Sequence, residues 1–122
     1  MTRINLVPPE ELHTKHLVAE LHELPRVFTL ARKAQRELHK KAIPSTYTLG
    51  TGHVLFFYQR LGFLADRYEA LCYEMRCRSF KCNQIPREDL LKDIDVRLIR
   101  AYNPSHTDIE LNRKRILERM PK

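Results

Sequence analysis

Two residues near the start of the chain carry groups suited to covalent catalysis. Thr2 has a small side chain, so removal of the initiator Met1 is expected to leave its α-amine free. An α-amine titrates near pH ~7.7–8, far below a lysine, and can therefore be an uncharged nucleophile at cellular pH. Glu23 is a carboxylate that could move protons beside such an amine. The pattern predicts an amine nucleophile with a carboxylate partner.

Positive charge surrounds these two residues in the sequence. Arg3 and Arg26 could hold phosphates, and the whole chain of 122 residues carries a formal charge of +7. A basic surface suggests a nucleic acid, an anionic membrane or an acidic protein as partner, although solubility alone is an alternative explanation. No stretch approaches the roughly 20 apolar residues of a membrane span, and no apolar signal region begins the chain. We therefore expect a cytoplasmic protein, associated with the nucleoid if its partner is DNA.

The three cysteines do not form a recognisable site. Cys72, Cys77 and Cys82 are odd in number, and their spacing of five matches no zinc pattern. Positions five apart do not share a helix face. We expect buried or incidental thiols rather than metal ligands or disulfides.

The first predicted helix begins at the Pro8-Pro9-Glu10-Glu11 signature and runs to about Lys41. An apolar residue recurs every three or four positions and predicts the buried stripe: Leu17, Leu21, Leu24, Phe28 and Ala31. Pro25 removes one backbone hydrogen bond inside this helix, so a kink is expected near Leu21 to Leu24.

The opposite face of the same helix is cationic. At about 100° per residue, one polar stripe contains Lys15, His22, Arg26, Lys33 and Lys40. His16 and Glu23 are seven residues apart and fall together along its margin. The stripe predicts a phosphate-binding ridge with a carboxylate at its edge; an ordinary solvated helix face is the alternative.

The remaining pattern is also helical. A loop is predicted over residues 42–51, and a second helix of about six turns follows, with its stripe at Val54, Phe57, Leu61, Leu64, Tyr68, Leu71 and Met75. One short helix is expected after Pro86. A last helix is expected over residues 105–120, with a capping box from Thr107 to Glu110. The residues expected to face the core are Ile109, Ile116, Leu117 and Met120. The residues expected to face solvent are Arg113, Lys114, Arg115 and Arg119. These elements predict an all-α compact single domain over residues 1–122, built of three main helices with irregular loops.

Three ordered blocks of sequence resemble one family. They are Thr2-Arg3-Ile4-Asn5-Leu6, then Glu23-Leu24-Pro25-Arg26-Val27-Phe28, then Gly50-Thr51-Gly52-His53-Val54 followed by Phe56-Phe57-Tyr58 and Leu61. In these blocks the chain resembles the pyrimidine-dimer DNA glycosylase/AP lyase family, the endonuclease V type of T-even phages. The blocks occupy the first two-thirds of the chain.

The resemblance implies a function and a set of site residues. It implies removal of a damaged base through an imine on the Thr2 α-amine, followed by β-elimination aided by Glu23. The DNA-binding residues expected from the resemblance and the cationic stripe together are Arg3, Lys15, His16, His22, Arg26 and Lys33. The implied partner is damaged double-stranded DNA, bound by a monomer that needs no metal or other cofactor.

Differences from the family pattern leave more than one function open. His22 stands where the resemblance implies an arginine, Lys15 stands where it implies an amide, and the chain contains no Trp. The substrate could therefore be another lesion or a modified base. The same residues are also compatible with a non-catalytic basic module that binds nucleic acid, or with a protein that binds an acidic protein partner.

Overall fold

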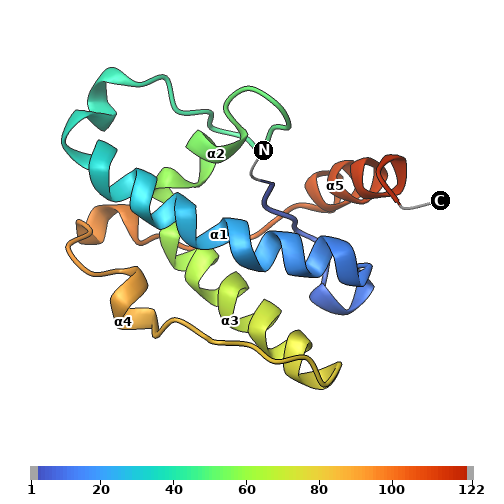
Figure 1. Cartoon of the computed structure of the whole chain (residues 1–122). Coiled ribbons are helices and arrows are strands. Elements are labelled where there is room, and N and C mark those ends of the chain that lie inside the picture. The colour runs from blue at the N-terminus through green and yellow to red at the C-terminus, as the bar shows by residue number, and fades with distance from the viewer. Residues whose placement is uncertain (1–2, 121–122) are drawn as a thin grey trace.

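The computed structural model describes residues 3–120, apart from the side chain of His39, and every regular element in that range is a helix. The predicted all-α fold is confirmed, and the three main helices are those expected (Figure 1). The α-helices are α1 (Thr14–Ala34), α2 (His53–Phe56), α3 (Leu61–Cys77), α4 (Arg87–Leu90) and α5 (His106–Glu118); the 3-10 helices are η1 (Pro9–Glu11), η2 (Gln35–Lys40), η3 (Phe57–Gln59) and η4 (Val96–Leu98).

The core lies where α1 crosses α3 (Figure 1). All five residues of the predicted α1 stripe are buried, and in the second stripe only Val54 is less than fully buried. Side chains three and four positions apart lie on one helix face, so each helix presents a continuous apolar surface to the other. The helix α1 continues through Pro25, and the kink expected there stays a prediction.

Two predicted helix boundaries are wrong. The Pro8-Pro9 signature begins only the short η1, and α1 begins separately at Thr14, where the His13 ring nitrogen accepts a hydrogen bond from the Lys15 N–H. The second helix is interrupted at Arg60, whose backbone is not helical. The Arg100 carbonyl accepts the Phe63 N–H at 3.1 Å, so a distant segment of the chain satisfies a donor in the first turn of α3.

The returning segment also explains Gly62. A Cβ atom at this position would lie 3.0 Å from the Arg100 carbonyl oxygen, tighter than nine in ten real Cβ contacts. Glycine therefore allows residues 100–102 to pass against the start of α3.

The last helix, α5, differs from its prediction in three ways. The hydroxyl of Ser105, rather than Thr107, caps it by accepting the Asp108 N–H at 3.1 Å. Ile109 and Ile116 pack on the core as expected, but Leu117 and Met120 are exposed. The fully buried residue of α5 is Asn112, whose Oδ1 accepts the N–H groups of Leu6 and Val7 in the amino-terminal segment.

The three cysteines are free thiols; Cys72 is buried, Cys82 is half-buried and Cys77 is exposed. None of the helices within residues 3–120 is both long enough and apolar enough to cross a membrane.

Candidate active site

The amino-terminal segment, residues 3–7, lies between helices in an extended conformation (Figure 1). Ile4, Asn5, Leu6 and Val7 are all at most 7% exposed. Buried backbone donors and acceptors need partners, and this segment has no neighbouring strand to supply them. Side chains from distant parts of the chain must therefore hold it.

One such partner is His53, at the start of α2. Its Nε2 accepts the Ile4 N–H at 2.8 Å, and its Nδ1–H donates to the Thr48 carbonyl at 2.8 Å. This pair of bonds requires the neutral imidazole with its proton on Nδ1. Burial is the main cause that lowers the pKa of His53, with the positive charge of Arg3 acting in the same direction. His53 is thus a structural residue that fixes Ile4.

The other end of the segment is held by α5 and α3. The Asn112 Oδ1 accepts the N–H groups of Leu6 at 2.6 Å and Val7 at 3.2 Å, and the Arg67 guanidinium donates to the Val7 carbonyl. Asn112 Nδ2 also donates to Asn5 Oδ1 at 2.9 Å. A single buried amide therefore binds three groups of the segment.

These bonds continue into a buried ion pair. Arg67 donates from Nε and Nη2 to the two carboxylate oxygens of Glu20 at 2.8 and 3.0 Å, and Asn5 Nδ2 donates to Glu20 Oε1 at 2.8 Å. We call Asn5, Glu20, Arg67 and Asn112 the buried polar network. It joins the amino-terminal segment to α1, α3 and α5, so it fixes residues 5–7 of that segment.

A cavity of about 310 Å³ opens beside this network. We call it the amino-terminal cavity. Its walls come from the amino-terminal segment, from one face of α1 and from the end of α5, through Arg3, Asn5, His16, Ala19, Glu20, Glu23, Ile116 and Arg119. The prediction that His16 and Glu23 share one margin of the first helix is confirmed, because both line this cavity.

Three arginines gather at the cavity: Arg3 and Arg119 line it together with the carboxylates of Glu20 and Glu23, and Arg115 lies close to Arg3. Burial lowers the pKa of Arg3, and the neighbouring charges of Arg115 and Arg119 lower it further. Three buried nitrogens around the site, Arg3 Nη1, Arg115 Nε and His16 Nδ1, have no hydrogen-bond partner among residues 3–120. Arg3 Nη1 and Arg115 Nε are donors, and unpaired buried donors are costly; an anion is the ligand that satisfies several guanidinium donors together. The site is therefore suited to phosphate.

Glu23 provides the carboxylate of the site. It is half-buried, and its Oε2 lies 3.2 Å from Nη1 of the exposed Arg26, one helical turn further along α1. The cavity thus has an ionisable acid on the α1 wall and guanidinium groups on the facing walls. Such a site can bind a phosphodiester and move a proton next to it.

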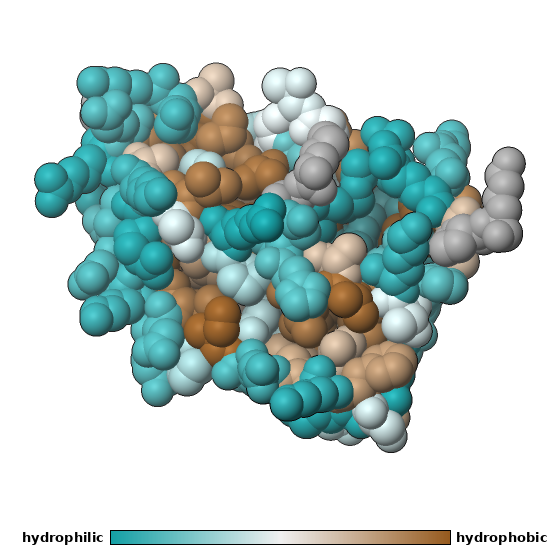
Figure 2. Space-filling view, viewed as in Figure 1, coloured by the Kyte–Doolittle hydropathy of each residue, from teal (hydrophilic) through white to brown (hydrophobic). Residues whose placement is uncertain are grey.

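The structure separates the predicted site residues into two groups. Arg3, His16 and Glu23 meet in the cavity, whereas four lie on the solvent side of α1: Lys15, His22, Arg26 and Lys33. Figure 2 shows the face on which α1 lies in front, with hydrophilic side chains interspersed with apolar patches. Thr2 lies outside the described residues, and its chain neighbour Arg3 is the first residue of the cavity wall.

Sequence analysis missed the residues that support the site. Glu20 and Arg67 fall among the apolar stripe positions of their helices, and a charged residue at a core position is the signal that could have indicated a buried pair. Nothing local distinguishes Asn112 from a surface residue. Arg119 is exposed, as expected of an outward-facing residue, and Arg115 is half-buried, but sequence analysis did not predict that the charges of both would act on Arg3.

The model of one protein family, described as pyrimidine dimer DNA glycosylase, matches residues 1–87. The chain belongs to this family. The match covers the amino-terminal segment, α1 and α3, so most of the cavity wall is made by family residues. It stops at the start of α4, so Ile116 and Arg119 of α5 come from the part of the chain outside the match.

Among residues 3–120, no group of three or more His, Cys, Asp or Glu side chains is arranged to hold a metal ion.

Proposed function

We propose that this member of the family is a DNA N-glycosylase with AP lyase activity that acts on cyclobutane pyrimidine dimers. The observation that carries the proposal is the amino-terminal cavity, in which Arg3 and Glu23 lie together. Thr2 precedes Arg3 in the chain, so its α-amine is at most a few ångströms of backbone away from the cavity wall. The family match supports the class of substrate.

The first chemical stage releases the base. The Thr2 amine nitrogen attacks C1′ of the deoxyribose, and the base leaves with the electron pair of the glycosidic bond and gains a proton. Loss of the amine proton and opening of the sugar ring give an imine between the enzyme and C1′. The positive charge of Arg3 disfavours protonation of the adjacent amine and so keeps it nucleophilic.

The second stage cuts the strand. Glu23 accepts a proton from C2′, and the electron pair of that C–H bond expels the 3′ phosphate as the C3′–O bond breaks. The imine at C1′ acidifies the C2′ proton, which is why covalent catalysis assists this step. Hydrolysis of the imine then returns the free amine.

Arginine side chains at the cavity bind the DNA during both stages. Arg3, Arg115 and Arg119 contact phosphates beside the reacting sugar, and the exposed stripe of α1 adds further phosphate contacts. The sugar carbon is not accessible in a regular duplex, so the DNA must bend and a nucleotide must rotate out. That distortion costs a few kcal/mol and is least at a damaged site.

Borohydride trapping tests the chemistry. The mature protein, with Met1 removal confirmed by intact mass, is incubated with a duplex that contains one pyrimidine dimer or one abasic site, and the imine is then reduced. We expect a covalent adduct whose crosslinked peptide begins at Thr2, and no adduct after acetylation of the α-amine. Adduct formation by a protein with a blocked amine would refute the role of Thr2.

The role of Glu23 is tested by Glu23→Gln. This variant is expected to bind abasic DNA with nearly unchanged affinity and to lose strand cutting by at least a hundredfold, a typical contribution of general acid–base catalysis. Glu88→Gln, which changes an exposed acid on α4, is the matched control and should cut normally. Full cutting by Glu23→Gln would remove this residue from the mechanism.

One observation favours a second candidate, a glycosylase for a different damaged or modified base. The α5 wall of the cavity lies outside the family match, and walls around an extruded base set its specificity. A panel of duplexes with different lesions separates the two candidates by rates of base release. Salt-sensitive binding with no adduct on any member of the panel would instead indicate a non-catalytic DNA-binding protein.

A further inference from the structure

A second and larger cavity, of about 690 Å³, lies at the other end of α1. We call it the arginine groove and define it by Gln35, Arg36, Gln59, Arg97 and Arg100. Leu38 and Leu98, both buried, also line it. It shares no residue with the amino-terminal cavity, and neither the amino-terminal segment nor α5 contributes to it. It is therefore a separate site.

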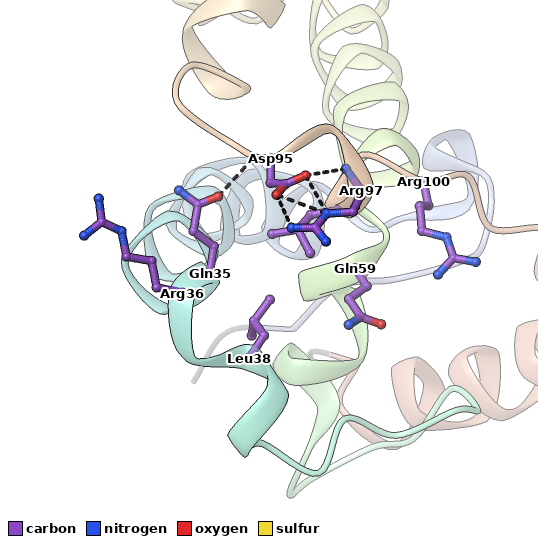
Figure 3. Close-up of a pocket in the computed structure, with 8 residues that line it drawn as sticks. Gln35, Arg36, Leu38, Gln59, Asp95, Arg97 and Arg100 are labelled. Carbon is purple, nitrogen blue, oxygen red and sulfur yellow. Dashed lines mark hydrogen bonds and ion pairs between the residues drawn. The ribbon is translucent and has the colours of Figure 1, made fainter.

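The groove has an excess of positive charge. Three guanidinium groups and a single carboxylate, that of Asp95, line the groove. Asp95 accepts hydrogen bonds from Arg97 at 2.7 to 3.2 Å. Within residues 3–120, Arg36 and Arg100 form no ion pair with a carboxylate. Figure 3 shows Arg97, Arg100 and Gln59 around the hollow, with Arg36 at its edge.

A fourth arginine extends this charge. Arg60 and Arg100 line a smaller cavity of about 280 Å³ that also includes Gln59, so the two cavities adjoin. Arg60 lies 3.9 Å above the Phe56 ring and donates to the Phe56 carbonyl at 2.6 Å. Burial lowers the pKa of Arg60, and the like charge of Arg100 lowers it further. Two guanidinium groups held near one another in this way favour a shared anion.

The backbone that carries these arginines is fixed. Gln35 accepts the Asp95 N–H at 2.9 Å and donates to the Asp93 carbonyl at 2.8 Å. Arg32 donates to the carbonyls of Leu90 and Lys92 at 2.8 and 2.7 Å. Four hydrogen bonds from two side chains of α1 and η2 therefore attach the loop before η4 to the helix. The groove is a built feature of the fold rather than a chance gathering of surface side chains.

We propose that the arginine groove is a second phosphate-binding site, and that it takes the sugar-phosphate backbone of DNA outside the segment bound at the amino-terminal cavity. Guanidinium groups match phosphate oxygens in geometry and charge, and glutamine amides also donate to phosphates in protein–DNA complexes. The choice of DNA over other phosphate ligands rests on the proposed function.

The separation of the two sites gives the proposal a length scale. Glu23 lines the amino-terminal cavity and Gln35 lines the groove, and they are 12 positions apart on continuous helical backbone. At 1.5 Å per residue this is about 18 Å along the axis, or roughly five base pairs of duplex at 3.4 Å each. DNA that extends only about four base pairs from the lesion cannot reach the groove from the cavity.

The experiment compares two duplexes, each with a central tetrahydrofuran abasic analogue that cannot form an imine. One has about eight base pairs and is closed at one end by a polyethylene-glycol linker; the other has about 30 base pairs, long enough to contact both sites. Binding is measured by fluorescence anisotropy across a salt series. The variant is Arg97→Gln/Arg100→Gln in the full chain. Arg76→Gln/Lys81→Gln removes the same charge from exposed positions at the far end of α3 and is the matched control.

We expect the groove variant to bind the long duplex roughly tenfold more weakly at low salt, with the slope of log K against log salt reduced by up to about two. Its affinity for the short duplex and its borohydride trapping on a short duplex with a true abasic site should match those of the wild type. The control variant should show a much smaller change on the long duplex.

Three results would overturn the proposal. They are unchanged affinity for both duplexes, an equal loss on both, and a loss no larger than that of the control variant. Phosphate-dependent shifts of the Arg97 and Arg100 side-chain NMR signals, without any effect of DNA length, would indicate an anion site that does not bind DNA. Failure of trapping with a normal length effect would instead refute the catalytic proposal and leave the groove standing.

Discussion

Each of the two sites contains an arginine–carboxylate ion pair, and the two pairs have nearly equal N···O distances but differ in their exposure to solvent. Arg67 and Glu20 lie 2.8 Å apart beside the amino-terminal cavity, with side chains 6% and 1% exposed. Arg97 and Asp95 lie 2.7 Å apart at the arginine groove, with side chains 85% and 37% exposed. The first pair is therefore shielded from water, whereas the second is in contact with it.

Burial decides what each pair does. Removal of one partner from a buried pair leaves an uncompensated charge in the interior, whereas water replaces a partner lost at the surface. The buried polar network therefore fixes a segment of backbone, residues 5–7. Hydrogen bonds from Arg97 hold the pKa of Asp95 at about 2, and this pair orients a guanidinium group that remains accessible. The pair beside the amino-terminal cavity holds backbone in place, whereas the pair at the arginine groove presents a positive charge to solvent.

The largest expected effect comes from Glu20→Gln, which leaves the buried Arg67 without its counter-charge. We expect a loss of about 3–5 kcal/mol in the free energy of unfolding, measured by urea denaturation. Asp95→Asn breaks the exposed pair and should leave the urea midpoint unchanged. Equal losses in the two variants would show that burial does not distinguish the pairs.

Asn112→Ala tests whether position depends on a single buried amide. The substitution leaves the N–H groups of Leu6 and Val7 without an acceptor, at a cost of about 1–3 kcal/mol for each unsatisfied group. The rate of borohydride trapping should fall at temperatures where the variant is still folded, because the amino-terminal segment is less well fixed. Asn83→Ala, at an exposed position, is the control. Normal trapping by folded Asn112→Ala would show that this residue supports stability alone.

The pH dependence of stability examines the hydrogen bond between His53 and Ile4. Because burial lowers the pKa of His53 below its usual 6.5, the unfolded chain takes up a proton at a higher pH than the folded chain does. Its contribution to stability is thus complete above pH 6.5 and is lost as the pH falls, by about 1.4 kcal/mol per pH unit while folded His53 stays neutral. Urea unfolding between pH 7.5 and pH 5 measures this slope. His53→Gln should have a shallower slope, and an identical slope would exclude His53 as its source.

The smallest expected effect is that of Gln35→Ala, which changes no charge. Without its two hydrogen bonds the loop before η4 is held less firmly, and we expect the affinity for the long duplex to fall about two- to threefold, in line with the loss of modest net hydrogen bonds. Affinity for the short duplex should not change. An undiminished affinity for the long duplex would mean that the groove acts through net charge alone.

Much of the fold could be predicted from local pattern. The apolar stripes of α1 and α3 follow from spacings of three and four residues, and the structure buries the residues of these stripes. The interruption at Arg60 could not be predicted in this way, because the Arg100 carbonyl that accepts the Phe63 N–H lies 37 positions further along the chain.

The candidate site divides along the same line. Sequence alone determined the helical class, the cationic face of α1, the shared margin of His16 and Glu23, and the family blocks, since each depends on residue type and local spacing. Only the tertiary structure decided which side chains hold the amino-terminal segment and where the arginine groove forms. Asn112 meets Leu6 across 106 positions and Gln35 meets Asp95 across 60. Contacts between residues so far apart in the sequence form only when the helices pack together, and the spacing of residues along a single helix does not predict them.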